Sequence, residues 1–60
     1  MPIIEIKVVK GRDRETLGRC MKRVAECVAE ELGAPLESIR VITVEVEPEL
    51  FAVGTRLKSE

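Results

Sequence analysis

The sequence predicts an α/β (α+β) fold: a single β-α-β unit with two parallel strands and a short C-terminal hairpin segment, in one domain over residues 1–60. Two observations support this fold. Residues 3–9 and 39–46 are rich in β-branched residues and show the two-residue alternation of strands. Between them, apolar residues recur every three or four positions, as on one face of a helix. Two strands joined by a helical crossover pair in parallel.

The first predicted strand, residues 3–9, reads IIEIKVV. Successive side chains of a strand point to opposite faces, so Ile4, Ile6 and Val8 form one fully apolar face. Glu5 and Lys7 lie on the other face, between Ile3 and Val9.

The helix is predicted to begin at Asp13 and to end before Gly33. Asp is a favoured N-cap, and Gly is the favoured residue after the last helical turn, here with Pro35 two residues beyond it. Gly11 turns the chain ahead of the helix. The residues expected to form its buried stripe are Leu17, Cys20, Met21, Val24, Cys27, Val28 and Leu32.

The two cysteines, Cys20 and Cys27, are seven residues apart in this helix, which separates them by about 10 Å along its axis. That distance is too long for a disulfide. The chain has no His and no CxxC pair, so a structural metal site is not expected. We expect two small buried thiols in a reducing compartment, the cytoplasm, and nothing in the sequence resembles a signal peptide or a membrane span.

The second predicted strand, residues 39–46, has two unlike faces. Val41 and Thr43 lie on one face, with Ile39 and Glu45 at its ends. Arg40 lies on the other, which is otherwise apolar: Ile42, Val44 and Val46. Pro48 ends the strand, and Leu50 to Thr55 are predicted to form the short hairpin segment, which is free to pair with a neighbouring subunit.

Composition limits the partners. Ten basic and eleven acidic residues are interspersed along the chain, and Phe51 is its one aromatic residue. A nucleic-acid or membrane-surface protein is expected to show a basic stripe or an aromatic platform, so neither role is predicted. A domain of this length hides only about 60% of its unfolded surface. Without disulfides or metals, we expect stability to come from association of subunits.

The chain begins Met-Pro, and this start has two interpretations. Pro is tolerated as the first residue of a strand because it donates no backbone hydrogen bond, so Pro2 has a purely structural reading. Removal of Met1 would instead leave Pro2 with a free secondary amine, which can act as a base.

Several motifs stand in a fixed order: an initial MP before an apolar strand, then GR, a helix, GAPLESIRV and a late FxVG. In this ordered set the chain resembles the 4-oxalocrotonate tautomerase family of the tautomerase superfamily. The resemblance covers Pro2 to about Gly54. It implies one tautomerase-like domain, assembly into a homohexamer that is a trimer of dimers, and an N-terminal Pro that acts as general base. A hetero-oligomer with a second, similar chain stays open.

The same resemblance implies the site residues. They are four catalytic residues and two residues of the pocket wall: Pro2, Arg12, Arg40 and Phe51, then Val9 and Val53. The two arginines would each bind one carboxylate of a dicarboxylate substrate such as 2-hydroxymuconate, and the pocket would exclude water. Desolvation and two guanidinium groups disfavour an ammonium ion, so the Pro2 amine would be free near neutral pH. This reaction requires no metal and no organic cofactor.

Two other functions stay open at this stage. One is a 3-haloacrylate dehalogenase or hydratase on the same scaffold, which would need a carboxylate to activate water. The other is a non-catalytic assembly subunit, in which Pro2 only starts a strand and the arginines only pair between subunits.

Overall fold

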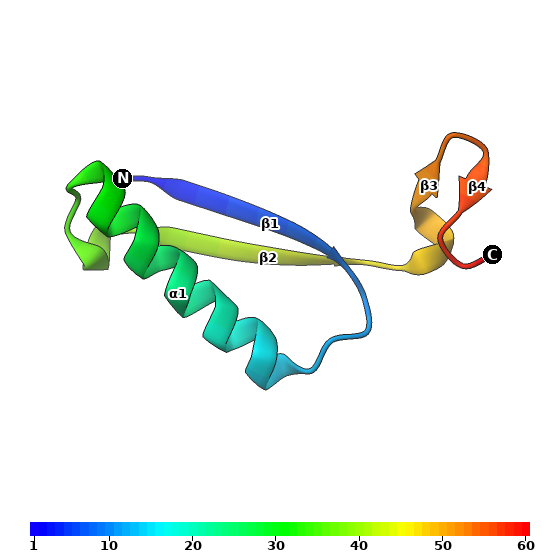
Figure 1. Ribbon diagram of the computed structural model, residues 1–60, viewed down its shortest axis with the longest axis horizontal. Coiled ribbons are helices and arrows are strands. Elements are labelled where there is room, and N and C mark those ends of the chain that lie inside the picture. The colour runs from blue at the N-terminus through cyan, green and yellow to red at the C-terminus, as the bar shows by residue number, and fades with distance from the viewer.

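A computed structural model describes all 60 residues, and it has the predicted β-α-β order followed by the predicted C-terminal hairpin (Figure 1). Short 3-10 turns, η1 and η2, precede and follow the second strand. The elements are β1 (Ile3–Val9), α1 (Arg14–Leu32), η1 (Leu36–Ser38), β2 (Arg40–Val46), η2 (Pro48–Leu50), β3 (Ala52–Val53) and β4 (Arg56–Leu57).

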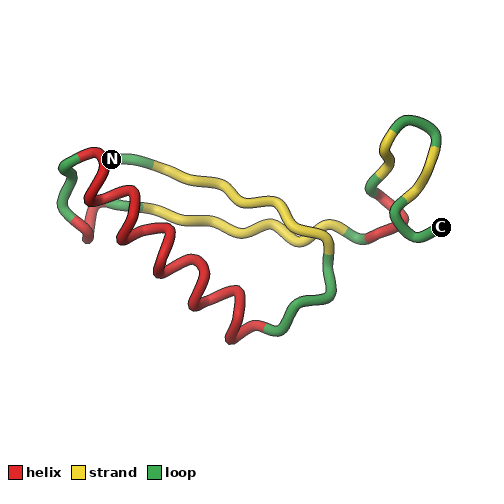
Figure 2. The backbone as a smooth tube through the Cα atoms, in the orientation of Figure 1, coloured by secondary structure: helices red, strands yellow, loops and turns green.

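Strands β1 and β2 are parallel, as predicted, and pair in register from Ile3 opposite Arg40 to Val9 opposite Val46. The alternation of burial along both strands shows one covered face and one open face. Helix α1 runs along the strands and connects the far end of β1 to the near end of β2 (Figure 2). The open face carries Ile3, Glu5, Lys7, Val9, Arg40, Ile42, Val44 and Val46.

Both predicted ends of the helix are confirmed. The Asp13 carboxylate accepts hydrogen bonds from the Thr16 backbone N–H at 3.0 Å and from the Thr16 hydroxyl at 2.7 Å. These hydrogen bonds lower the pKa of Asp13 below its ordinary value, and the bond from the Thr16 hydroxyl has the larger effect. Gly33 has a left-handed φ of 66°, which favours glycine, and its N–H donates to the Ala29 carbonyl.

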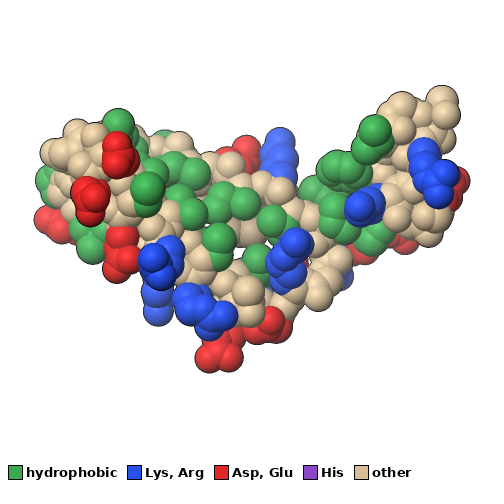
Figure 3. All heavy atoms as spheres, viewed as in Figure 1, with side chains coloured by type: hydrophobic (Ala, Val, Ile, Leu, Met, Phe, Trp, Pro, Cys, Tyr) green, Lys and Arg blue, Asp and Glu red, His purple; other side chains and the backbone are tan.

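The isolated chain has almost no interior. Leu17 and Ile39 are its two buried residues. The radius of gyration is 14.3 Å, whereas a compact domain of this length has one of about 10 Å. Hydrophobic side chains are visible over the strands and continue to the hairpin (Figure 3). Such a shape is expected for a chain that completes its core with other subunits.

The predicted helix stripe is wider than the face that packs. Met21, Val24 and Val28 are half-buried around Leu17. Cys20 and Cys27, however, are exposed, and Leu32 is 65% exposed, so the prediction of buried thiols is wrong for the single chain. The physical reason is that a sheet of only two strands is narrow, so it covers the middle of the apolar face of α1 and leaves the edges of that face exposed.

The hairpin exists, but its limits differ from the prediction of Leu50 to Thr55. Leu50 belongs to η2, and the paired strands are β3 and β4, with Ala52 opposite Leu57 and Val53 opposite Arg56. Gly54, at a φ of 64°, makes the turn between them. The hairpin stands away from the β-α-β unit, beyond the end of β2 (Figure 1), and β4 packs on η2.

Helix α1 is too polar to cross a membrane, and no other helix is long enough.

Candidate active site

Pro2 and Arg40 lie side by side at one end of the sheet. The Arg40 backbone N–H donates to the Pro2 carbonyl at 3.0 Å, so the parallel ladder extends to the residue before β1. Pro2 is half-buried, and Met1, which precedes it, is 80% exposed. The ladder therefore holds the Pro2 backbone in position next to the start of β2.

The guanidinium of Arg40 is exposed and has no carboxylate partner. It donates one hydrogen bond, from its Nη1 to the Glu37 carbonyl at 2.9 Å, and takes part in no ion pair. The side chain thus reaches solvent from an apolar face instead of being neutralised there. Its positive charge is therefore not compensated by a carboxylate of the same chain.

Arg12 lies in the loop between β1 and α1, at the opposite end of the sheet. It is exposed and has no ion pair or side-chain hydrogen bond. Two neighbouring cations are paired: Arg14 with Glu45 at 2.7 Å and Lys10 with Glu47 at 3.1 Å. Arg12 is therefore the unpaired cation of this loop.

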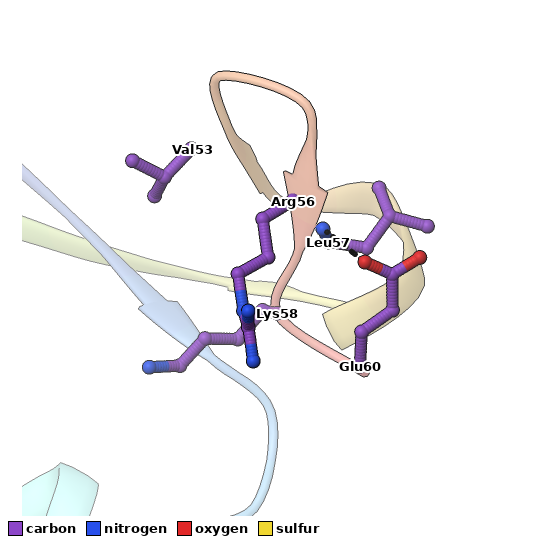
Figure 4. A pocket seen from close by; sticks show the side chains of 5 residues that line it. All are labelled: Val53, Arg56, Leu57, Lys58 and Glu60. Atoms are coloured by element: carbon purple, nitrogen blue, oxygen red, sulfur yellow. Dashed lines mark hydrogen bonds between the residues drawn. The ribbon is translucent and has the colours of Figure 1, made fainter.

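Phe51 and Val9 also lie at the Arg12 end. Val9 ends β1 and is half-buried, and Phe51 follows η2 with 40% of its surface exposed. Val53, in the hairpin, is 72% exposed and lines a shallow pocket of about 220 Å³ with Arg56, Leu57, Lys58 and Glu60 (Figure 4). None of the four predicted catalytic residues lines that pocket.

The predicted site residues thus form two groups that are separated by the length of β1. Its seven residues span about 23 Å at about 3.3 Å per residue. A carboxylate that binds an arginine lies within about 3 Å of it. One small substrate therefore does not reach Pro2 and Arg12 of the same chain, and a site that contains both needs more than one chain.

The sequence profile described as "Tautomerase enzyme" matches residues 2–60. The chain belongs to the tautomerase family. The "Probable tautomerase" of Lactiplantibacillus plantarum is 40% identical over 60 residues, which cover 100% of this chain and 94% of that protein. The 2-hydroxymuconate tautomerase of Pseudomonas putida is 37% identical over 60 residues, 100% of this chain and 95% of that protein.

A solved structure agrees with the fold of this tautomerase. The heterohexameric 4-oxalocrotonate tautomerase of Chloroflexus aurantiacus is 27% identical and superposes with a TM-score of 0.95, over 100% of this chain and 97% of that chain. These similarities confirm the predicted family and the tautomerase fold. They also show that the chain is an isomerase of the tautomerase kind.

Two ion pairs of the tautomerase were not predicted from the sequence. The Glu45 carboxylate is mostly covered and binds Arg14, the first residue of α1, and Glu47 binds Lys10. Both pairs connect the loop that carries Arg12 to the end of β2. One sequence feature could have indicated the pair with Arg14: Glu45 lies on the covered face of β2, where burying an unpaired carboxylate is costly.

Proposed function

We propose that this tautomerase converts 2-hydroxymuconate-like dienols to the conjugated 2-oxo acid, with Pro2 as the base. The observation that carries the proposal is that two arginines of the predicted site have no carboxylate partner. Arg40, beside Pro2, and Arg12, at the far end, both lack carboxylate partners, although Lys10 and Arg14, which flank Arg12 in the sequence, are paired. Full-length similarity to a 2-hydroxymuconate tautomerase supports the same substrate class.

In the proposed reaction, the free amine of Pro2 accepts the proton of the 2-hydroxyl group and returns a proton to a distant carbon of the conjugated chain. Arg40 binds the near carboxylate and draws electron density toward the 2-oxo oxygen as it forms. Arg12 binds the far carboxylate. Phe51, Val9 and Val53 exclude water, which strengthens both charge-assisted contacts.

The proposed site is composite, and we propose a homohexamer that supplies it. The open sheet face includes Ile42, 49% exposed, and Val44, 37% exposed, which a second chain would cover. Packing of this kind would also bring Arg12 and Phe51 of one chain toward Pro2 of another. In this proposal, assembly serves catalysis as well as stability.

The test is an ultraviolet assay of 2-hydroxymuconate turnover with the parent protein, Pro2→Ala and Pro35→Ala. Loss of a general base costs about 10²- to 10⁴-fold in rate, so Pro2→Ala should be strongly impaired. Pro35 lies in the loop before η1, outside the proposed site, and its variant controls for the loss of a proline.

Two outcomes would reject the proposal. Equal activity of Pro2→Ala and the parent would leave Pro2 as a strand starter and favour the assembly-subunit reading. Faster turnover of 3-chloroacrylate than of 2-hydroxymuconate would favour the dehalogenase reading, although Ala52, Val53 and Gly54 after Phe51 offer no carboxylate to activate water.

A further inference from the structure

One face of the hairpin combines apolar and cationic side chains. Val53 is directly opposite Arg56 in the antiparallel ladder, and residues in such a pair share a face. The Lys58 N–H donates to the Phe51 carbonyl at 2.8 Å, which places Lys58 opposite Phe51 in the same register. Because Phe51 and Val53 are two residues apart, all four side chains lie on one face. We call Phe51, Val53, Arg56 and Lys58 the hairpin face.

The two cations of the hairpin face have no partner in the chain. Neither Arg56 nor Lys58 takes part in an ion pair or donates a side-chain hydrogen bond. Both line the pocket of about 220 Å³ that also includes Val53. Two adjacent, uncompensated positive charges beside an apolar wall are suited to an organic anion.

The one carboxylate of this pocket does not neutralise them. Glu60 also lines the pocket, but its Oε1 accepts a hydrogen bond from the Leu57 backbone N–H at 3.2 Å. Figure 4 shows Glu60 and Leu57 on one side of the hairpin, and Val53, Arg56 and Lys58 on the other. The positive charge of the hairpin face therefore stays available.

We propose that Arg56 and Lys58 form an anion-binding position that takes the far carboxylate of the substrate together with Arg12, so that the protein selects doubly charged acids over singly charged ones. The proposal rests on the proposed function, because it takes Phe51 and Val53 as part of the substrate pocket. It assigns to these two cations a role in specificity and none in proton transfer.

The experiment compares two ligands with the same six-carbon diene chain: muconate, with two carboxylates, and sorbate, with one. Their dissociation constants are measured by titration calorimetry for the parent and for the double variant Arg56→Gln/Lys58→Gln. The double variant Arg19→Gln/Lys22→Gln removes two unpaired helix cations and is the control. Binding is measured without turnover, so the result does not depend on whether Pro2 is the base.

The expected result is a loss of about tenfold in muconate affinity for the hairpin variant, with little change for sorbate and little change in the control. In the turnover assay, the hairpin variant should show a raised KM for the dienol substrate and a kcat close to that of the parent. Equal weakening of both ligands, or the same loss in the control variant, would overturn the proposal.

A third variant, Arg56→Lys/Lys58→Arg, keeps both charges and should restore muconate affinity. Native mass spectrometry is run on every variant. If the Gln variant fails to assemble, and the charge-preserving variant assembles without recovering preferential muconate binding, then the two residues hold subunits together and the proposal is wrong.

Discussion

Mixing two inactive variants should restore activity, because the proposed site takes Pro2 from one chain and Arg12 from another. The variants are Pro2→Ala, which lacks the base, and Arg12→Ala, which lacks the far carboxylate contact. The two positions are separated by about 23 Å of strand within a chain, so one site takes them from two chains. An oligomer of either variant alone contains no complete site, because every chain lacks the same residue. A mixed oligomer, however, contains some sites in which both residues are intact.

The expected size of the recovery follows from counting. In an oligomer assembled at random from equal amounts of both variants, half of the sites receive an intact Pro2, and half of those receive an intact Arg12. About one quarter of the sites are therefore complete, and activity should reach about one quarter of the parent value. If Pro2 and Arg12 of the same chain made the site, no mixed site would be complete.

The assay is turnover of 2-hydroxymuconate after both variants are unfolded together in denaturant and refolded. The control mixes Pro2→Ala with Arg19→Ala, where Arg19 is an unpaired arginine of α1 outside the site, and about half of the parent activity is expected. A refolded mixture of Pro2→Ala and Arg12→Ala that is no more active than the average of the separate variants would refute the composite site. The activities of the mixture and of the separate variants are compared only for preparations in which native mass spectrometry shows mixed oligomers.

Three further predictions concern the chain terminus and the helix. A sample that retains Met1 should fold and assemble but have little activity, because the Pro2 nitrogen is then a tertiary amide without basicity; intact-mass measurement beside the assay tests this, and full activity in a wholly Met1-bearing sample contradicts it. Gly18→Ala should stabilise the protein by about 0.5–1 kcal/mol, because a Cβ there meets no atom within 4 Å; a lower melting temperature would mean that a neighbouring chain contacts the helix at Gly18. The lowered pKa of Asp13, caused by its hydrogen bonds with Thr16, means that this cap stabilises the fold at neutral pH and loses that contribution as the pH falls below about 4, through its folded pKa. Asp13→Asn, which caps without titrating, should therefore lose less stability than the parent between about pH 5 and pH 3, and an identical acid transition would contradict this.

Sequence patterns within single elements were sufficient to predict the β-α-β unit. The alternation in residues 3–9 defines β1 without error, and the cap residues Asp13 and Gly33 define both ends of α1. The position of Arg40 on an apolar face also followed from alternation, and the parallel register explains why it lies beside Pro2. These features depend on neighbours in sequence or on a single strand pairing.

Features that depend on contacts between residues far apart in the sequence, or on how much surface another element covers, were harder to predict. The exposure of Cys20 and Cys27 depends on how much of the helix a two-stranded sheet covers. The pairing of Arg14 with Glu45 joins residues that no short motif connects. In the hairpin, Gly54 makes the turn at its centre, so the returning strand lies beyond the predicted limit.

The separation of the two groups of site residues has a consequence for gene duplication. Two gene copies that encode this chain are free to diverge at opposite ends of β1. If the site is composite as proposed, and one copy keeps Pro2 while the other keeps Arg12, their products still build some complete sites when they assemble together, although neither is active alone. Each loss leaves part of the sites complete as long as the other copy is expressed, and once both losses have occurred, activity requires both genes. A one-gene enzyme built in this way becomes a two-gene enzyme through losses alone, without the gain of a single new residue.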